Sequence, residues 1–185
     1  MRKELRVLFA TALLCAPVFG LANYAAAGPR GEKKQRSEPK NIANEVRHRL
    51  VMLPWYSVFD NLAYKVEGDK VTLYGQVTRP TLKSDAEAVV KGIEGVSTVV
   101  NNIEVLPPSP MDDQLRRALY RAIYGDPGLS RYSIQAVPSI HIIVKNGNVT
   151  LEGVVDSEAD KNLAGIRANQ VPNVFSVKNN LVVGN

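Results

Sequence analysis

The chain has 185 residues, 45% hydrophobic and 22% charged, and a formal net charge of +5. Its single cysteine excludes a disulfide framework, and its two histidines leave little material for acid–base or metal chemistry. The positive charge lies outside residues 41–185, which hold 15 basic and 15 acidic side chains, so composition argues against a nucleic-acid partner.

Residues 1–27 have the pattern of a cleavable signal peptide. A basic start at 1–6 precedes an apolar run, and the small residues 25–27 suit a cleavage site. Cys15 lies inside this segment and follows two leucines, which argues against lipoprotein processing. An uncleaved membrane anchor is the alternative, although the run contains Pro17 and Gly20. We therefore expect export to the periplasm or cell envelope.

Residues 28–40 form a basic segment with five basic and two acidic side chains and no apolar residue larger than proline. Such a composition buries too little surface to fold, so we expect a disordered tether. Its charge favours a weak attraction to anionic lipid headgroups.

The first folded unit is expected over residues 41–106. Apolar residues at helical spacing predict a helix from Ile42 that ends before Pro54. A hairpin follows, with strands over 62–66 and 71–77. A second helix is expected from Pro80 to Gly95, and a last strand over 96–105.

A proline-rich spacer at 107–110 precedes a second unit over 111–185. Asp112 or Asp113 is the expected N-cap of its first helix, which ends at the Gly-Asp-Pro-Gly sequence 125–128. Strands over 140–144 and 149–155 flank an Asn-Gly turn, a strong hairpin signal. Asp156 is expected to begin the second helix, and residues 175–183 to form the last strand.

The two units are copies of one another. Residues 71–105 and 149–183 align without a gap at an offset of 78, with twelve of 35 positions identical. The shared positions are mostly valines, glycines and asparagines, and none is a histidine, cysteine or carboxylate. We therefore predict an α+β protein of two tandem αββαβ units, each a three-stranded mixed sheet with two helices on one face.

This element order, a glycine two residues after Val-Thr-Leu, and a closing segment with an Asn pair resemble the BON domain (bacterial osmotically inducible and nodulation proteins). The motif positions are Gly75, Asn101 and Asn102, repeated as Gly153, Asn179 and Asn180. The resemblance implies an exported envelope protein, often induced by osmotic or other stress, that associates with phospholipid surfaces. It implies no catalytic residues, cofactor or metal. One departure is Pro172-Asn173, where the first unit has Glu94-Gly95.

Most chemically suggestive residues have a structural explanation. His141 lies in an apolar strand, and His48 lies on the polar side of a helix. The acidic residues of 156–160 suit helix capping better than a cation site. Gly75 and Gly153 lack a phosphate-loop motif around them and instead indicate close backbone approach. The Asn pairs are interpreted as edge hydrogen-bonding groups, and we expect no histidine and carboxylate to converge in a pocket.

The segment 50–59 holds the only tryptophan and is the feature with most functional content. Aromatic side chains with a polar group suit a water–lipid boundary or a partner surface. Val51, Met52, Trp55 and Tyr56 are therefore the candidate contact residues. The alternative is that this segment, Phe59 included, closes the core of the first unit.

The sequence thus favours a non-enzymatic envelope protein that binds a phospholipid surface or an envelope partner. A protein that binds a small ion or hydrophobic solute in a cleft between the units is the alternative.

Overall fold

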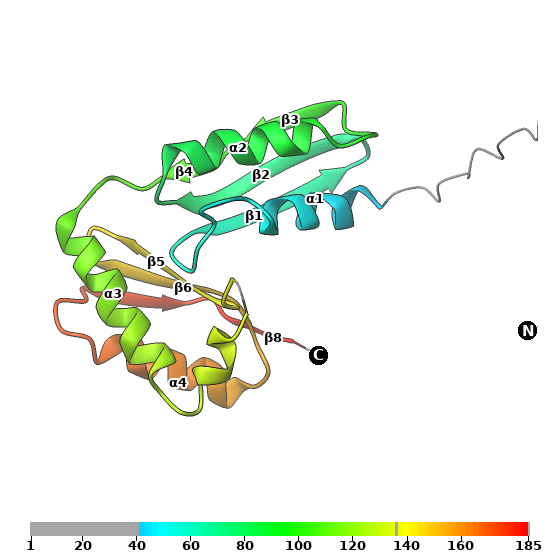
Figure 1. Ribbon diagram of the computed structural model, residues 1–185. Helices are drawn as coiled ribbons and strands as arrows, with labels where there is room; N and C mark the ends of the chain where they lie inside the picture. Colours follow the sequence, from blue (N-terminus) through cyan, green and yellow to red (C-terminus); the bar gives the residue numbers. More distant parts are fainter. Residues whose placement is uncertain (1–40, 136, 185) are drawn as a thin grey trace, which may run out of the picture. The chain divides into compact units, whose positions relative to one another are not determined.

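The computed structural model of the protein describes residues 41–135 and 137–184. All of them belong to one compact part of the chain, which contains both predicted units. The expected signal peptide and basic tether lie outside the described residues. Figure 1 shows one order of elements, helix–strand–strand–helix–strand, occurring twice.

The first copy consists of α1 (Ile42–Val51), β1 (Asn61–Glu67), β2 (Lys70–Val77), α2 (Pro80–Lys91), β3 (Thr98–Asn101) and β4 (Glu104–Val105). The second consists of α3 (Pro110–Tyr124), the short 3-10 helix η1 (Ser130–Ser133), β5 (Ile140–Lys145), β6 (Asn148–Val155), α4 (Glu158–Asn169), β7 (Ser176–Asn179) and β8 (Val182–Val183).

Both sheets have the same mixed topology. In the first, β2 is central, antiparallel to β1 and parallel to β3 and β4. In the second, β6 pairs in the same way with β5, β7 and β8. The predicted α+β fold is confirmed, with one refinement: the last strand of each unit is broken into two short pieces that pair with the same central strand.

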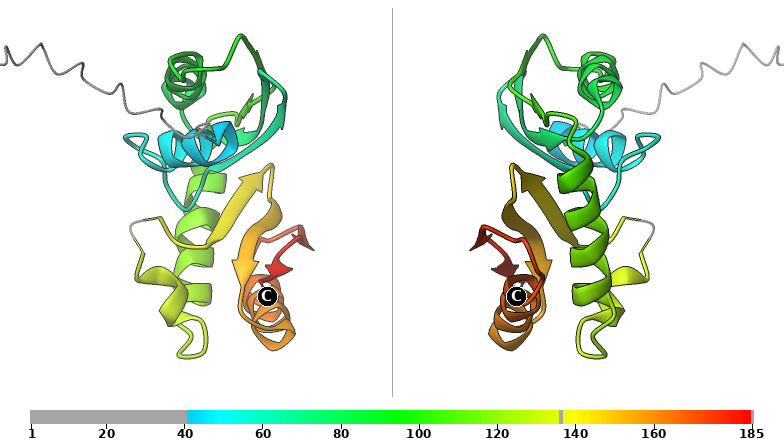
Figure 2. Two further views of the ribbon diagram at one scale, coloured as in Figure 1. Left: turned by 90° about the vertical axis from the view of Figure 1, so that its right-hand side faces the viewer. Right: turned by 90° about the vertical axis from the view of Figure 1, so that its left-hand side faces the viewer.

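Figure 2 shows the helices and sheets of both units from two further sides. Each unit has its own apolar core between its two helices and its sheet. Val46 and Leu50 of α1 meet Ala86 and Val90 of α2 over fully buried Leu73 of β2. The second core repeats the arrangement, with buried residues that include Leu115, Leu119, Ile123, Ala164, Ala168 and Leu151. The helical spacing of apolar residues in the sequence thus correctly predicted which faces of these helices are buried.

The predicted N-caps of the second unit were wrong by one to four residues. Ser109 caps α3, because its hydroxyl accepts from the Asp112 amide at 3.2 Å and Pro110 suits the first helical position. Asp112 is instead buried and accepts from the amides of Asn146 and Gly147 at 2.8 and 2.9 Å. It therefore ties α3 to the hairpin turn.

The cap of α4 is Ser157, one residue after the expected Asp156. The Ser157 hydroxyl accepts from the Asp160 amide at 3.1 Å and donates to the Asp160 carboxylate at 2.6 Å. The helix thus starts at this acidic segment, as predicted, but the predicted capping by its carboxylates is wrong, because the capping side chain is Ser157.

The glycine predicted at the end of each hairpin is required by close approach. A Cβ built on Gly75 would lie 1.9 Å from the Asn61 carbonyl oxygen, and one on Gly153 would lie 1.9 Å from that of Ser139. Both residues also have a strongly positive φ, +117° and +125°. The prediction of close backbone approach is confirmed.

The departure at Pro172-Asn173 preserves the backbone shape of the first unit. Gly95 has a φ of +93°, and Asn173, its counterpart at the offset of 78, has a φ of +67°. Asparagine tolerates this left-handed region better than most residues with a side chain, so the turn before the last strand is retained.

The first asparagine of each pair explains the break in the last strand. The Asn101 side-chain amide donates to the Lys83 carbonyl at 2.9 Å, while its oxygen accepts from the Ile103 amide at 3.1 Å. Asn179 repeats both bonds, to Lys161 at 2.7 Å and from Leu181 at 3.2 Å. Each asparagine thus fastens the strand break to the preceding helix.

We expect Asn101→Ala and Asn179→Ala each to lower the free energy of unfolding by about 1–2 kcal/mol, because each leaves a backbone amide and a carbonyl without their partner. Urea denaturation measures this, and Asn102→Ala is the neighbouring control. Equal effects at 101 and 102 would contradict the assigned role.

Candidate functional site

The segment after α1 presents an exposed apolar surface. The exposed fractions are 45% for Val51, 69% for Met52 and 67% for Trp55. These three residues, hereafter the lip, come from the last turn of α1 and the loop that follows it. Three of the four candidate contact residues are therefore exposed and near one another in the chain.

Trp55 is held in an unusual conformation beside a cation. Its φ of +71° lies in the left-handed region, which a bulky side chain rarely adopts. The guanidinium carbon of Arg79 lies 4.8 Å from the centroid of the Trp55 ring, a cation–π contact. The exposed ring is thus held at the surface at a cost in backbone strain, a pattern that often marks a functional position.

Tyr56, the fourth candidate, differs from the lip. It packs against the core of the first unit, and burial raises its pKa to about 12. Its ring stacks on His141 of β5, with the ring centroids 5.6 Å apart. Trp55 and Tyr56 are adjacent in sequence yet have opposite environments, which the aromatic composition of the segment did not reveal.

The end of the segment packs against the second unit. Val58 is a buried member of the second core, and Phe59 packs against that core and against Tyr120. The Ile142 amide donates to the Val58 carbonyl at 2.8 Å. The alternative that segment 50–59 closes the first core therefore holds for Leu50 and Leu53. It is wrong for Trp55, Val58 and Phe59.

Asp60 is a structural residue that the sequence patterns did not identify. It is fully buried, and its carboxylate accepts from the amide and hydroxyl of Ser57 and from the amide and hydroxyl of Thr78, at 2.6–3.1 Å. These bonds hold the segment to the end of β2. An Asp three residues after a Ser in an irregular segment was the available signal.

A cleft of about 750 Å³ adjoins this segment and receives side chains from both units. Arg47 and Leu50 of α1 and Leu62 and Tyr64 of β1 line it, together with η1 and the start of β5. His141 and Asp156 both line the cleft, so the expectation that no histidine and carboxylate share a pocket was wrong.

The shared cleft does not make these two residues a catalytic pair. The Asp156 carboxylate accepts from the Arg131 guanidinium at 3.1 Å. His141 lies on Tyr56, and burial lowers its pKa, while the nearby backbone of Asp60 and Ser57 acts in the opposite direction. His48 is exposed on α1, as predicted.

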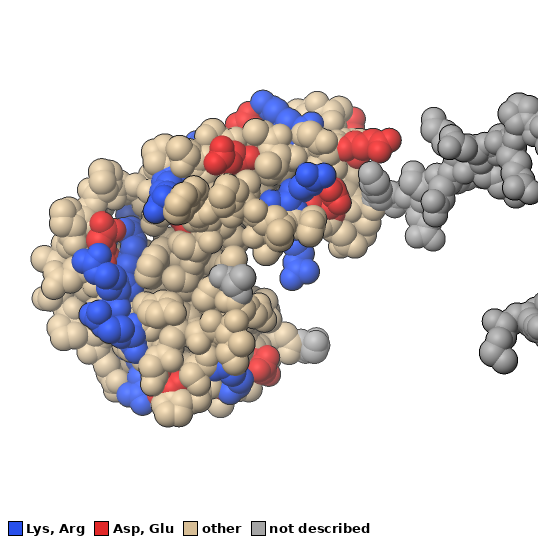
Figure 3. All heavy atoms as spheres, viewed as in Figure 1, with Lys and Arg blue, Asp and Glu red and all other residues tan. Residues whose placement is uncertain are grey.

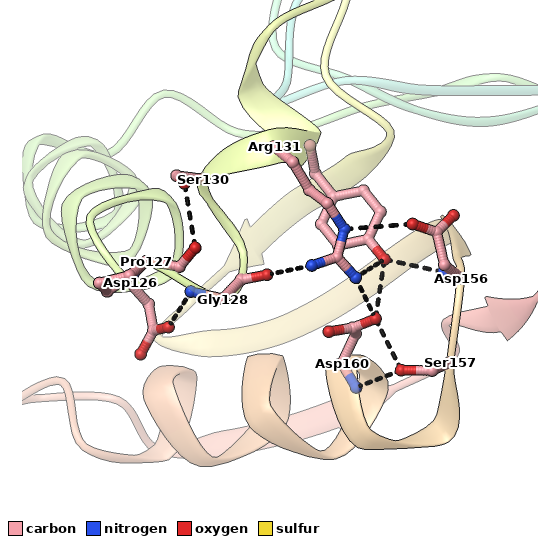
Figure 4. Close-up of polar contacts among 9 residues, drawn as sticks. Asp126, Pro127, Gly128, Ser130, Arg131, Asp156, Ser157 and Asp160 are labelled. Atoms are coloured by element: carbon pink, nitrogen blue, oxygen red, sulfur yellow. Dashed lines mark hydrogen bonds and ion pairs between the residues drawn. The ribbon is translucent and has the colours of Figure 1, made fainter.

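One arginine binds two carboxylates of the acidic segment 156–160, as Figure 4 shows. Arg131 of η1 donates to Asp156 and, at 2.5 Å, to Asp160. Hydrogen bonds from Ser157 and Tyr132 and the Arg131 charge hold the pKa of Asp160 below its usual value. No group of three or more potential metal ligands occurs within residues 41–135 and 137–184.

The near-neutral charge of the folded part is unevenly spread. Figure 3 shows a band of Lys and Arg on the face that carries α3. Arg117 and Arg121 are the exposed arginines of this helix. In the described part of the chain, no helix is both long and apolar enough to cross a membrane.

The chain is similar to proteins of known sequence and structure. Osmotically-inducible protein Y of Escherichia coli (strain K12) is 32% identical over 130 residues, which cover 65% of this chain and 61% of that protein. The chain thus matches about three fifths of the length of this relative. The C-terminal domain of CdsD, the structural protein of the Type III secretion system of Chlamydia trachomatis, aligns over 80% of this chain and 100% of its own length, with 13% identity and a TM-score of 0.32. A second CdsD structure gives a TM-score of 0.28.

The family assignment rests on the domain model. A model of the BON domain matches residues 40–107 and again residues 111–185, which together make up most of the chain. The two matches coincide with the two αββαβ copies. The chain therefore belongs to the BON domain family, of which it carries two copies.

Proposed function

We propose that the protein is a non-enzymatic, exported envelope protein that associates with phospholipid membrane surfaces through the lip. The observation that carries this proposal is the cluster of Val51, Met52 and Trp55, all exposed within five residues. The name of its relative, Osmotically-inducible protein Y, supports a role under osmotic stress.

The chemistry of the lip suits the boundary between water and lipid. Tryptophan prefers this boundary because its ring is apolar and its N–H is polar. Arg79, stacked on the ring, adds a cation beside the apolar surface that would meet anionic headgroups. The lip would enter the interface while the charged group remains in the headgroup layer.

One such contact is a weak anchor, and stable association takes two signals. The basic segment 28–40 supplies a second, with a net charge of +3 and about 1 kcal/mol per basic residue near an anionic surface. The proposal is therefore that the lip and the basic segment act together.

We expect Met52→Ala combined with Trp55→Ala to weaken binding to anionic phospholipid vesicles at least tenfold. Each side chain contributes about 1.5–3 kcal/mol when fully removed from water, and tenfold corresponds to about 1.4 kcal/mol. Vesicle flotation of residues 28–185 measures the binding. Because both side chains are largely exposed, the melting temperature should change little.

Phe175→Ala is the matched control, since Phe175 is an aromatic residue of the second unit with 84% exposure. It should leave flotation unchanged. Deleting residues 28–40 should weaken binding further at low salt and less at high salt. Equal vesicle binding by the lip variant and the parent protein would refute the membrane role and leave an envelope protein as the partner of the lip.

A further inference from the structure

The cleft contains two buried polar atoms that the protein leaves without a partner. Ser139 Oγ and His141 Nδ1 have no hydrogen-bond partner, although neither atom is accessible to solvent. Both residues line the cleft, and they lie two positions apart at the start of β5. Buried polar atoms are nearly always hydrogen-bonded, so a pair of unpaired atoms in one cavity indicates a missing partner.

The other side chains of the cleft define the chemistry of that partner. Leu50, Leu62 and Val154 provide apolar walls, and Tyr64 and Tyr132 provide aromatic surface. Apolar walls with a few convergent polar groups are the usual composition of a small-molecule site, and about 750 Å³ is within the usual size range. The lining also includes polar side chains such as Asn61 and Gln135, so the occupant should combine an apolar part with polar groups.

The charge of the cleft indicates the sign of its occupant. Among the residues that line the cleft, Arg131 and Asp156 carry opposite charges and are paired. Arg131 also pairs with Asp160, which does not line the cleft. Arg47 is exposed at the cleft and has no ion-pair partner in the described part of the chain. The available charge is thus a single guanidinium, which pairs well with a carboxylate.

We propose that the cleft binds a small amphipathic organic anion. Its apolar body lies among Leu50, Leu62 and Val154, and its carboxylate pairs with Arg47. The Ser139 and His141 side chains turn toward the occupant, whose polar atoms complete their hydrogen bonding. This site shares Val51 with the lip, whereas Met52 and Trp55 do not line the cleft.

Octanoate is a suitable probe, with octanol and octyltrimethylammonium as neutral and cationic counterparts of the same chain length. Titration calorimetry of residues 28–185 should show saturable binding of octanoate, with octanol at least tenfold weaker and the cation weaker still. Binding of all three with similar affinity would indicate an apolar pocket without charge selection and would overturn the proposal.

Three variants test the assigned contacts. Arg47→Gln should weaken octanoate at least tenfold while leaving octanol unchanged, whereas Arg49→Gln should change neither, because Arg49 on the same helix is paired with Glu45. Ser139→Ala and His141→Phe should each weaken octanoate several-fold. Phenylalanine retains a ring for stacking on Tyr56 and lacks the Nδ1 atom.

Melting temperatures separate binding from folding. Ser139→Ala deletes a buried hydroxyl without a partner, so the ligand-free variant should melt at the same temperature as the parent or higher. A lower melting temperature with unchanged octanoate affinity would show that the hydroxyl serves the fold, and the proposal would fail. Met52→Ala with Trp55→Ala should leave octanoate binding intact even if it abolishes vesicle binding, so each proposal can fail without the other.

Discussion

Gly75→Ala is expected to lower the free energy of unfolding by about 3–5 kcal/mol, among the largest effects of any single substitution in this protein. The added Cβ would lie 1.9 Å from the Asn61 carbonyl oxygen and 2.8 Å from its carbon, so the β1–β2 pairing has to move. The φ of +117° adds strain for any residue with a side chain. Urea denaturation monitored by circular dichroism measures the change.

The hairpin turn provides a matched control. Gly68 also has a positive φ, +65°, but a Cβ there would meet nothing within 4 Å. Gly68→Ala should therefore cost only the intrinsic strain, about 1–2 kcal/mol. Gly153→Ala should reproduce the large loss, because its Cβ would lie 1.9 Å from the Ser139 carbonyl oxygen. If all three substitutions have equal effects, close backbone approach is not the reason for the repeated glycine.

Asp60→Ala is the second substitution with a large expected effect, a loss of about 3 kcal/mol or more. The carboxylate is fully buried and accepts four hydrogen bonds, so its removal leaves the amides and hydroxyls of Ser57 and Thr78 without an acceptor. Segment 57–60 should then separate from the end of β2, and the packing of Val58 and Phe59 on the second core should weaken.

Asp60→Asn keeps the shape of the side chain and removes its charge, so it tests which of the two stabilises the fold. The amide oxygen retains one pair of hydrogen bonds, but the amide nitrogen faces donors, so we expect a loss about half as large. Asp69→Ala is the control, because the exposed Asp69 carboxylate accepts from the Ser97 hydroxyl at the surface. It should cost about 0.5 kcal/mol or less. Limited proteolysis within 52–60 should increase for the Asp60 variants alone.

The fold was predictable because its signals are local and occur twice. The helical spacing of Val46 and Leu50, the Asn-Gly turn at 146–147 and the ungapped repeat each depend on residues close in sequence or at a constant offset. Together they determined the element order, the α+β class and the positions of Gly75 and Gly153.

Helix ends were less predictable, because several polar residues competed for each cap. Ser109, Asp112 and Asp113 all precede or begin α3, and only the hairpin packed against that helix decides that Asp112 is buried under Asn146. The break in each last strand was also missed, since it depends on Asn101 and Asn179 reaching a helix 18 residues earlier in the chain.

The candidate site was also predictable from the sequence only in part. The sequence by itself determined that segment 50–59 is apolar, aromatic and interrupted by a proline, and so identified it as the region of interest. Only the tertiary structure decided that Trp55 faces solvent, that Tyr56 lies on His141 and that Phe59 packs in the second core. The physical reason is that an irregular segment has no periodicity, so the direction of each side chain depends on the surfaces that fold against it.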